Sequence, residues 1–134
     1  MHSDFPGAVP EIPVSALLPA TAYYRDQLGF TVDWTEEALG LAGISRGGCR
    51  IFLADPSFRE GYGNTGPVLT WLNLDGKDAV NALHREWSTR GATLRSAPES
   101  KPWGLHEFTA VDPDGNLFRV FYDFATPARE AEPR

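Results

Sequence analysis

Few residues of this chain have the types and spacing that covalent catalysis needs. Its three histidines, His2, His84 and His106, are far apart in the sequence. The one cysteine, Cys49, follows two glycines and is expected to be a small buried residue. No serine lies in a nucleophile-elbow motif, and no glycine-rich run carries the lysine of a phosphate-binding loop. No pair of carboxylates is recognisable as a general acid and base. The sequence therefore favours binding over covalent chemistry.

Aromatic side chains are the more informative group, with four tryptophans in 134 residues. Trp34 ends a predicted strand beside Asp33, and Trp103 stands between Pro102 and Gly104 in a predicted loop. Planar heteroaromatic compounds stack on such rings, with a gain of about 0.5–1.5 kcal/mol beyond area burial. We therefore expect both rings to contact a planar ligand.

The other two tryptophans lie in predicted regular elements. Trp87 falls on the apolar face of a helix and is expected in the core. Trp71 alternates with Leu72 along a strand, so one of the two faces the core and the other faces outward. The sequence leaves that choice open, and Trp71 remains a candidate ligand contact.

The chain is acidic, with a net charge of −6 and a pI of about 4.9. This charge argues against nucleic acid and anionic membranes as partners. Acidity can serve solubility alone, or it can attract a cationic ligand. The carboxylates expected near the aromatic positions are Asp33, Glu36, Glu37, Asp55 and Glu60.

Location follows from what the sequence lacks. No apolar run reaches the roughly 20 residues that span a bilayer. Residues 1–7 contain no basic segment followed by an apolar one, so we expect no secretory signal. One cysteine cannot form an intrachain disulfide. Cytoplasmic location is the resulting expectation.

The predicted elements occur twice in the same order: strand, helix, three strands. The first set is 8–14, 17–28, 30–35, 39–45 and 49–54, and the second is 67–74, 75–90, 92–97, 105–111 and 117–122. The glycines that end the two helices, Gly29 and Gly91, lie 62 residues apart (91 − 29). Each set is too small to bury its sheet alone, so we expect the pair to share one core.

The predicted fold is therefore α+β, a single domain of two βαβββ modules over residues 8–124. Module one covers about 8–55, a loop covers 56–66, and module two covers about 67–124. Residues 1–7 are expected to be a loose terminus and residues 125–134 a disordered tail. The stretch from Asp55 to Gly66 is long for a loop and contains Tyr62, which makes Tyr62 a candidate ligand contact.

Three stretches resemble one protein family. Trp103-Gly104, Glu107-Phe108 and Asp112-Pro113-Asp114-Gly115-Asn116 together resemble the C-terminal signature of bleomycin-resistance-type proteins. These proteins belong to the glyoxalase/bleomycin resistance/dioxygenase (vicinal oxygen chelate) superfamily. Tyr23 to Phe30 is similar to the superfamily's Phe-Tyr-x-x-x-Leu-Gly-Phe pattern, and Leu83 to Trp87 to a Leu-Tyr-x-Glu-Trp run. The resemblance covers about residues 8–123.

The resemblance implies a cupped mixed sheet and a homodimer with two ligand pockets between its subunits. It also implies that Trp103, Trp34 and Phe52 line the ligand groove. Glu107 matches a glutamate of the family, and either ligand contact or a buried ion pair with Arg119 would explain it. His106 stands where the family usually has arginine, which leaves a pocket-facing role and an ordinary strand role both open.

Enzymes of the superfamily bind a divalent metal through His, Glu or Gln side chains on strands. The corresponding positions here fall near Ala8 or Val9, near Val68 or Leu69, and at Arg119. Apolar and cationic side chains cannot ligate a metal ion. We therefore expect neither a metal nor another cofactor.

Three hypotheses follow. The first is a non-catalytic homodimer that sequesters a planar, cationic aromatic natural product, such as a bleomycin-type antibiotic, and so gives drug resistance. The second is a metal-dependent lyase, isomerase or dioxygenase with non-standard ligands such as Glu11, His106 and Glu107. The third is a ligand-binding module in natural-product biosynthesis. The absence of the expected metal ligands favours the first.

Overall fold

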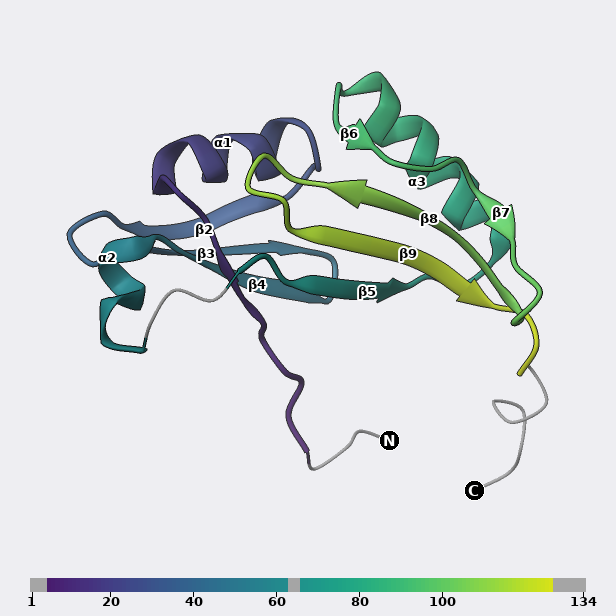
Figure 1. Cartoon of the computed structure of the whole chain (residues 1–134), viewed down its shortest axis with the longest axis horizontal. Coiled ribbons are helices and arrows are strands. Elements are labelled where there is room, and N and C mark those ends of the chain that lie inside the picture. Colours follow the sequence, from purple (N-terminus) through teal and green to yellow (C-terminus); the bar gives the residue numbers. More distant parts are fainter. Residues whose placement is uncertain (1–4, 63–65, 127–134) are drawn as a thin grey trace. The chain divides into compact units, whose positions relative to one another are not determined.

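The structure, a computed structural model, describes residues 5–62 and 66–126 (Figure 1). Its contacts divide the chain into two compact units, with the boundary between Gly66 and Pro67. Each unit contains one mixed sheet, of four strands in the first and five in the second. The α+β prediction with two βαβββ modules is confirmed, whereas the shared core and the homodimer stay predictions.

The first unit has the strand order β1-β4-β3-β2, with β1 parallel to β4 and the other pairs antiparallel. Its elements are β1 (Glu11–Pro13), α1 (Leu17–Asp26), β2 (Thr31–Glu36), β3 (Leu41–Arg46), β4 (Cys49–Ala54), α2 (Pro56–Arg59) and the 3-10 turn η1 (Glu60–Tyr62). Strand β1 lies at the edge of this sheet, a position that suits Pro13, because proline has no N–H to donate to a second neighbouring strand. Helix α1 packs on β2, β3 and β4 through Leu17, Ala20 and Tyr24.

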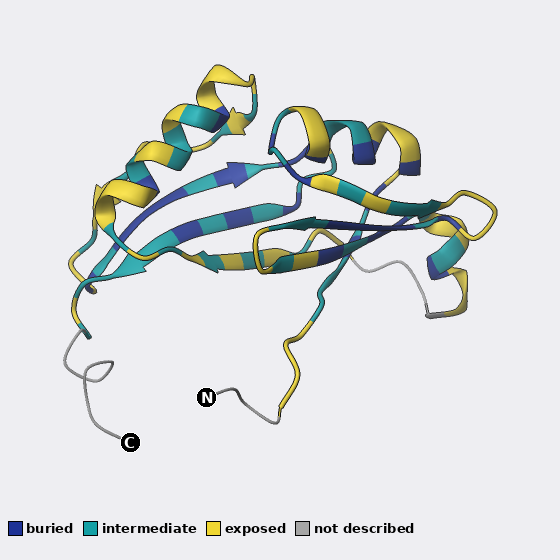
Figure 2. Ribbon diagram, turned by 180° about the vertical axis from the view of Figure 1, so that it is seen from behind, coloured by how far each residue is buried: buried dark blue, intermediate teal, exposed yellow. Residues whose placement is uncertain are grey.

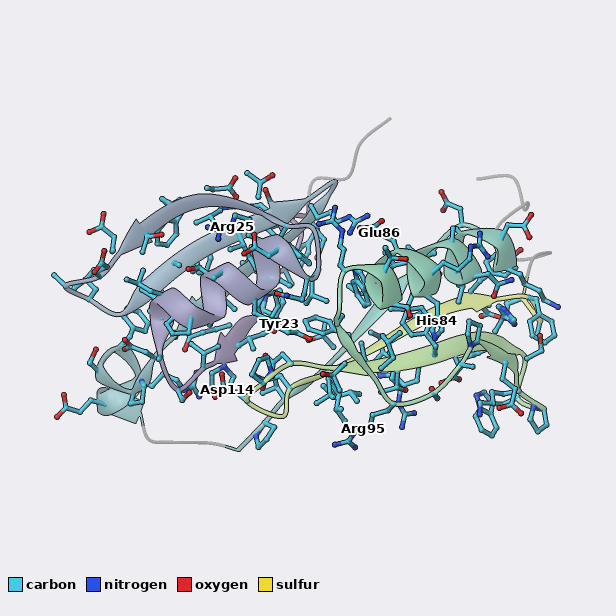
Figure 3. The ribbon with its side chains drawn as sticks, turned by 90° about the horizontal axis from the view of Figure 1, so that it is seen from above. Tyr23, Arg25, His84, Glu86, Arg95 and Asp114 are labelled. Carbon is cyan, nitrogen blue, oxygen red and sulfur yellow. The ribbon has the colours of Figure 1, made fainter. Side chains whose placement is uncertain are left out.

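The second unit has the strand order β5-β9-β8-β6, with β5 parallel to β9 and the short β7 paired to β8. Its elements are β5 (Leu69–Asn73), α3 (Lys77–Thr89), β6 (Thr93–Leu94), β7 (Glu99–Ser100), β8 (Leu105–Val111) and β9 (Leu117–Asp123). Helix α3 packs on β8 and β9. Trp87 is only 1% exposed there, with its ring 5.8 Å from that of Phe108, so its predicted core position is confirmed. His84, labelled in Figure 3, lies 5.1 Å from the same ring.

The turn between β8 and β9 is held by side chains as well as by backbone. Asp112 Oδ1 accepts hydrogen bonds from the backbone N–H groups of Asp114 and Asn116, at 2.9 and 2.8 Å. Asn116, fully buried, donates to Asp112 Oδ2 and accepts from the Val68 N–H at 2.9 Å. Gly115 supplies the positive φ of 87° that the turn requires. The turn therefore also fixes the start of β5 beside β9.

Three local expectations from the sequence were wrong: Asp75 as the N-cap of the second helix, an uninterrupted loop from Asp55 to Gly66, and a loop at 98–101. The N-cap of α3 is Gly76, which forms no side-chain cap. The stretch from Asp55 to Gly66 is not all loop, since it contains α2 and η1. The segment 98–101 holds the two-residue strand β7, which pairs with β8. Among the described residues, no helix is long and apolar enough to cross a membrane.

Candidate functional site

In each unit the long helix covers one face of the sheet (Figure 2). Side chains along each strand alternate between that face and the other. We call the face turned away from the unit's own long helix the open face. The first open face carries Glu11, Trp34, Gly43, Arg50 and Phe52, and the second carries Leu69, Trp71, Glu107, Arg119 and Phe121. Both faces present large half-exposed side chains, and the sites described below lie on them.

The first open face holds an aromatic pair. Phe52, Gly43 and Trp34 are cross-strand partners in one row of the sheet. The rings of Trp34 and Phe52 lie 5.3 Å apart, edge to face. A Cβ added to Gly43 would lie 2.5 Å from the Trp34 indole, so the indole lies directly over this glycine. The structure thus brings together two residues that the sequence predicted as ligand contacts.

Charged groups flank this pair. Arg50 places its guanidinium carbon 5.8 Å from the centre of the Phe52 ring. Glu11 Oε2 accepts a 2.6 Å hydrogen bond from Nη1 of Arg59, a residue that is 8% exposed. Glu11 is the row partner of Phe52, so this ion pair borders the aromatic pair at the β1 edge of the sheet.

Of the other predicted contacts of the first unit, Asp33 and Asp55 do not join the aromatic pair. Asp33 is the residue skipped by the irregular pairing between Val32 and Trp34, and it is exposed. Asp55 Oδ1 caps α2, accepting from Ser57 N at 3.0 Å and Phe58 N at 3.3 Å. Tyr62 belongs to η1, and its side chain lies outside the described part of the structure.

The second open face is built on β5, β9 and β8. Trp71 is 44% exposed and its ring lies 5.4 Å from that of Phe121, edge to face. The guanidinium carbon of Arg119 lies 5.1 Å from the centre of the Trp71 ring, within cation–π range. The sequence left open whether Trp71 or Leu72 faces the core. In the structure Trp71 lies on the open face and Leu72 lies on the helix side.

Trp103 stands at the start of β8. Its ring is 60% exposed, yet its Nε1 donates a 2.9 Å hydrogen bond to Oε2 of Glu107, which is only 4% exposed. Gly104 takes a φ of 93°, which lets the chain turn directly after the ring. Lys101 Nζ lies 5.8 Å from the ring centre. The exposed indole is therefore held in one orientation by a buried carboxylate.

Glu107 does not form the predicted ion pair with Arg119. The two residues lie on the same face of adjacent strands, since Glu107 pairs with Phe121 and Arg119 with Thr109. Within residues 5–62 and 66–126, no ion pair joins them. The carboxylate bonds the Trp103 indole instead.

His106 lies on the opposite side of the second sheet from Glu107, because neighbouring residues of a strand point to opposite faces. Its Nε2 lies 2.9 Å from Asn81 Oδ1 of α3, and its Nδ1 lies 2.9 Å from Ser100 Oγ of β7. Burial, and secondly the charge of Lys77, lower the pKa of His106 below its ordinary value. With Asn81 Oδ1 as an acceptor, the neutral ring carries its proton on Nε2 and accepts the Ser100 hydroxyl at Nδ1. The structure therefore does not bring His106 to the open face as a ligand contact.

The described residues do not fit a metal centre. Glu107 and His106 point to opposite faces of β8 and cannot ligate the same ion. Arg119 adds a cation to the face that carries Glu107. Among the described residues, no three His, Cys, Asp or Glu side chains lie close enough together to hold a metal. Glu11, His106 and Glu107 therefore do not come together as the ligands of one metal ion.

Arg119 and Phe121 lie on the second open face but were not predicted as candidate ligand contacts. The signal was present in the sequence, since Leu117, Arg119 and Phe121 alternate with Phe118 and Val120 along one strand. The helix-side residues Phe118 and Val120 are buried, and this places the other three on the open face.

The chain consists of two consecutive βαβββ modules, each with an aromatic open face. This repeat places it in the class of proteins built from paired βαβββ modules. The profile of the Glyoxalase/Bleomycin resistance protein/Dioxygenase superfamily matches residues 9–120. The chain belongs to this superfamily, as the sequence motifs predicted.

Solved structures show the same fold. A glyoxalase/bleomycin resistance protein/dioxygenase from Nocardioides matches with a TM-score of 0.74 and 19% identity, over 93% of this chain and 88% of that one. Lactoylglutathione lyase from Agrobacterium tumefaciens matches with 0.72 and 21%, over 91% and 98%. The bleomycin-binding protein from Streptomyces verticillus, solved with copper(II)-bleomycin, matches with 0.66 and 26%, over 89% and 97%. No curated protein sequence gives a significant match.

Proposed function

We propose that this protein binds a planar aromatic natural product and sequesters it unchanged, with a bleomycin-type antibiotic as the first candidate. The observation that carries this proposal is Trp103, whose ring is 60% exposed while its indole N–H is held by buried Glu107. A ring that is already oriented loses little conformational freedom when a ligand stacks on it. Protection would then come from affinity alone.

The aromatic pairs of the two open faces support the same proposal. Trp34 with Phe52, and Trp71 with Phe121, are edge-to-face pairs that leave ring surface for a further planar group. Pockets that bind small molecules are lined by such side chains, with a few polar groups that set orientation. Each pair by itself therefore offers a stacking surface to a planar group of a ligand.

The comparison with the Streptomyces verticillus protein supports the choice of ligand. That protein is described as bleomycin-binding, and it is 26% identical over 89% of this chain. The similarity to lactoylglutathione lyase, at 21% identity, concerns the fold alone. Since Glu107 and His106 point apart, sequestration accounts for the residues of β8 better than a metal-dependent isomerase does.

The structure offers fewer carboxylates for a cationic ligand than the sequence predicted. Asp55, one of the predicted carboxylates, caps α2, and Glu107, a predicted ligand contact, bonds an indole, so both are already used within the fold. A role in natural-product biosynthesis would use the same site, and ligand identity would distinguish it from resistance. A homodimer that binds two ligands remains part of the proposal.

The test is a titration of the protein with metal-free and copper-loaded bleomycin, in which binding is measured by calorimetry and by tryptophan fluorescence. We expect saturation at one ligand per subunit and an affinity at least about tenfold lower for Trp103→Ala, because a stacked aromatic contact contributes about 1 kcal/mol beyond its buried area. Leu18→Ala, which shortens an exposed side chain of α1 that is 50% exposed, is the control and should bind as the wild type does.

Sedimentation of the same samples should show a dimer. Absence of any saturable binding by folded, dimeric protein would reject bleomycin as the ligand. Equal affinity of the wild type and Trp103→Ala would remove Trp103 from the site.

A further inference from the structure

Arg119 has the most unusual environment on the second open face. Its guanidinium lies over the exposed ring of Trp71, with 5.1 Å between the guanidinium carbon and the ring centre. Its Nε is buried and has no hydrogen-bond partner among the described residues. Arginine stays charged at all physiological pH values, so it cannot relieve this burial by losing a proton.

The nearest candidate for an internal counterion is already used. Glu107 is the diagonal neighbour of Arg119 on the adjacent strand, and its Oε2 accepts the hydrogen bond of Trp103. No ion pair in the described part of the chain involves Arg119. A half-buried guanidinium whose buried Nε has no partner among the described residues can still donate hydrogen bonds to an oxyanion supplied from outside.

We propose that Arg119 is the charge-recognition residue of this face, and that the ligand carries a planar oxyanion, such as a carboxylate, beside its aromatic ring. This inference rests on the proposed function, since it names the chemistry of a ligand for the same site. It departs from the sequence-based expectation of a cationic ligand, and for this face it favours an anionic aromatic natural product over a cationic bleomycin-type antibiotic. The fork of N–H donors matches a carboxylate, while Trp71 and Phe121 supply ring surface next to it.

The experiment uses three probes that share one ring system: 2-naphthoate, 2-naphthamide and 2-naphthylmethylamine. They differ in charge, being anionic, neutral and cationic near pH 7. Affinities are measured by two-dimensional NMR on the full chain, following the backbone amides of β5 and β9. We expect naphthoate to bind about tenfold or more tightly than naphthamide, in line with a charge-assisted hydrogen bond, and naphthylmethylamine to bind most weakly.

Variants assign the charge preference to one residue. Arg119→Gln should reduce naphthoate affinity to that of naphthamide while leaving naphthamide within about twofold of its wild-type value. Arg119→Lys, which keeps the charge but not the fork, should retain part of the preference. Arg85→Gln removes an exposed charge of the same sign from α3 and should leave the preference intact.

The outcomes separate the two proposals. If no naphthalene probe binds, or if binding does not shift the amides around Trp71, aromatic binding at this face fails and the inference fails with it. If all three probes bind with equal affinity, or the amine binds best, the aromatic site stands and the anionic specificity is overturned. Loss of the preference in Arg50→Gln but not in Arg119→Gln would move the charge recognition to the first open face and also overturn the inference.

Discussion

The indole N–H of Trp103 and the carboxylate of Glu107 are joined by a 2.9 Å hydrogen bond between a largely exposed ring and a buried acid. The two residues are four positions apart, at the point where the chain enters β8 after Gly104. Through this bond, a buried carboxylate of the second unit sets the orientation of a ring at the surface of that unit.

Removing Trp103 and removing Glu107 should lower the free energy of unfolding by different amounts. Trp103→Phe leaves buried Glu107 without this donor, and we expect a loss of about 1–3 kcal/mol in the free energy of unfolding. Glu107→Leu removes the buried carboxylate itself and leaves only an exposed indole, which water can satisfy, so we expect a change within about 1 kcal/mol. Urea unfolding of both variants measures this. A larger loss in Glu107→Leu than in Trp103→Phe would contradict the structural assignment.

Gly43 should be required for the aromatic pair of the first open face. Gly43→Ala places a methyl group within 2.5 Å of the Trp34 indole, so the ring must leave Phe52. We expect loss of the cross-peaks between the two rings in NOESY spectra and up to about 1.5 kcal/mol lower stability. Gly48→Ala is the matched control, because nothing lies within 4 Å of a Cβ there. Persistent ring-to-ring cross-peaks in Gly43→Ala would show that the indole does not lie over this glycine.

His106 should make stability depend on pH in the acid range. Its pKa is lowered in the folded state by burial and by Lys77, relative to about 6.5 when unfolded. Between these two pKa values the unfolded chain binds more protons than the folded chain. The contribution of His106 to the free energy of unfolding is therefore fully present above about pH 6.5 and is lost as pH falls through the folded pKa. Melting temperatures of the wild type and His106→Gln should therefore converge as pH falls from 7 to 5. Parallel curves for the two proteins would refute the prediction, and NMR titration of the ring would check the pKa directly.

The ion pair of Glu11 and Arg59 should matter more than an exposed pair of the same type. Arg59 is almost fully buried, and breaking a buried pair leaves a charge without compensation, so we expect Glu11→Gln to cost about 2–4 kcal/mol. Asp26→Asn is the control, since Asp26 pairs with Arg25 where both side chains are more than half exposed. We expect less than about 1 kcal/mol there. Equal effects in chemical unfolding would show that the Glu11 pair is well solvated.

The repeat and the C-terminal ends of its two long helices were predictable from the sequence. Gly29 and Gly91 both take positive φ after a helix, so the same backbone requirement marks the same point in both units. Trp87 was predictable as core because helical spacing identifies its face without reference to the rest of the fold.

The composition of the site was less predictable, because one residue of register decides the face of a strand. His106 and Glu107 are neighbours with similar polarity, and only the structure shows that His106 contacts Asn81 of α3 while Glu107 is buried on the open face, where it bonds Trp103. The role of Asp55 also depended on tertiary context, since α2 had to form before its carboxylate could act as a cap. Roles of Trp34, Phe52, Trp71 and Trp103 in ligand binding stay predictions.

The alternation of side chains along β9 has an evolutionary consequence. Phe118 and Val120 are buried on the helix side, while Arg119 and Phe121 lie on the open face, so residues that stabilise the fold alternate with residues that we propose for ligand binding along one strand. A substitution at an outward position can alter what is bound without disturbing the packing beneath it. Such a strand allows new specificities to arise by single steps on an unchanged scaffold, which suits a superfamily whose members differ widely in sequence at similar fold.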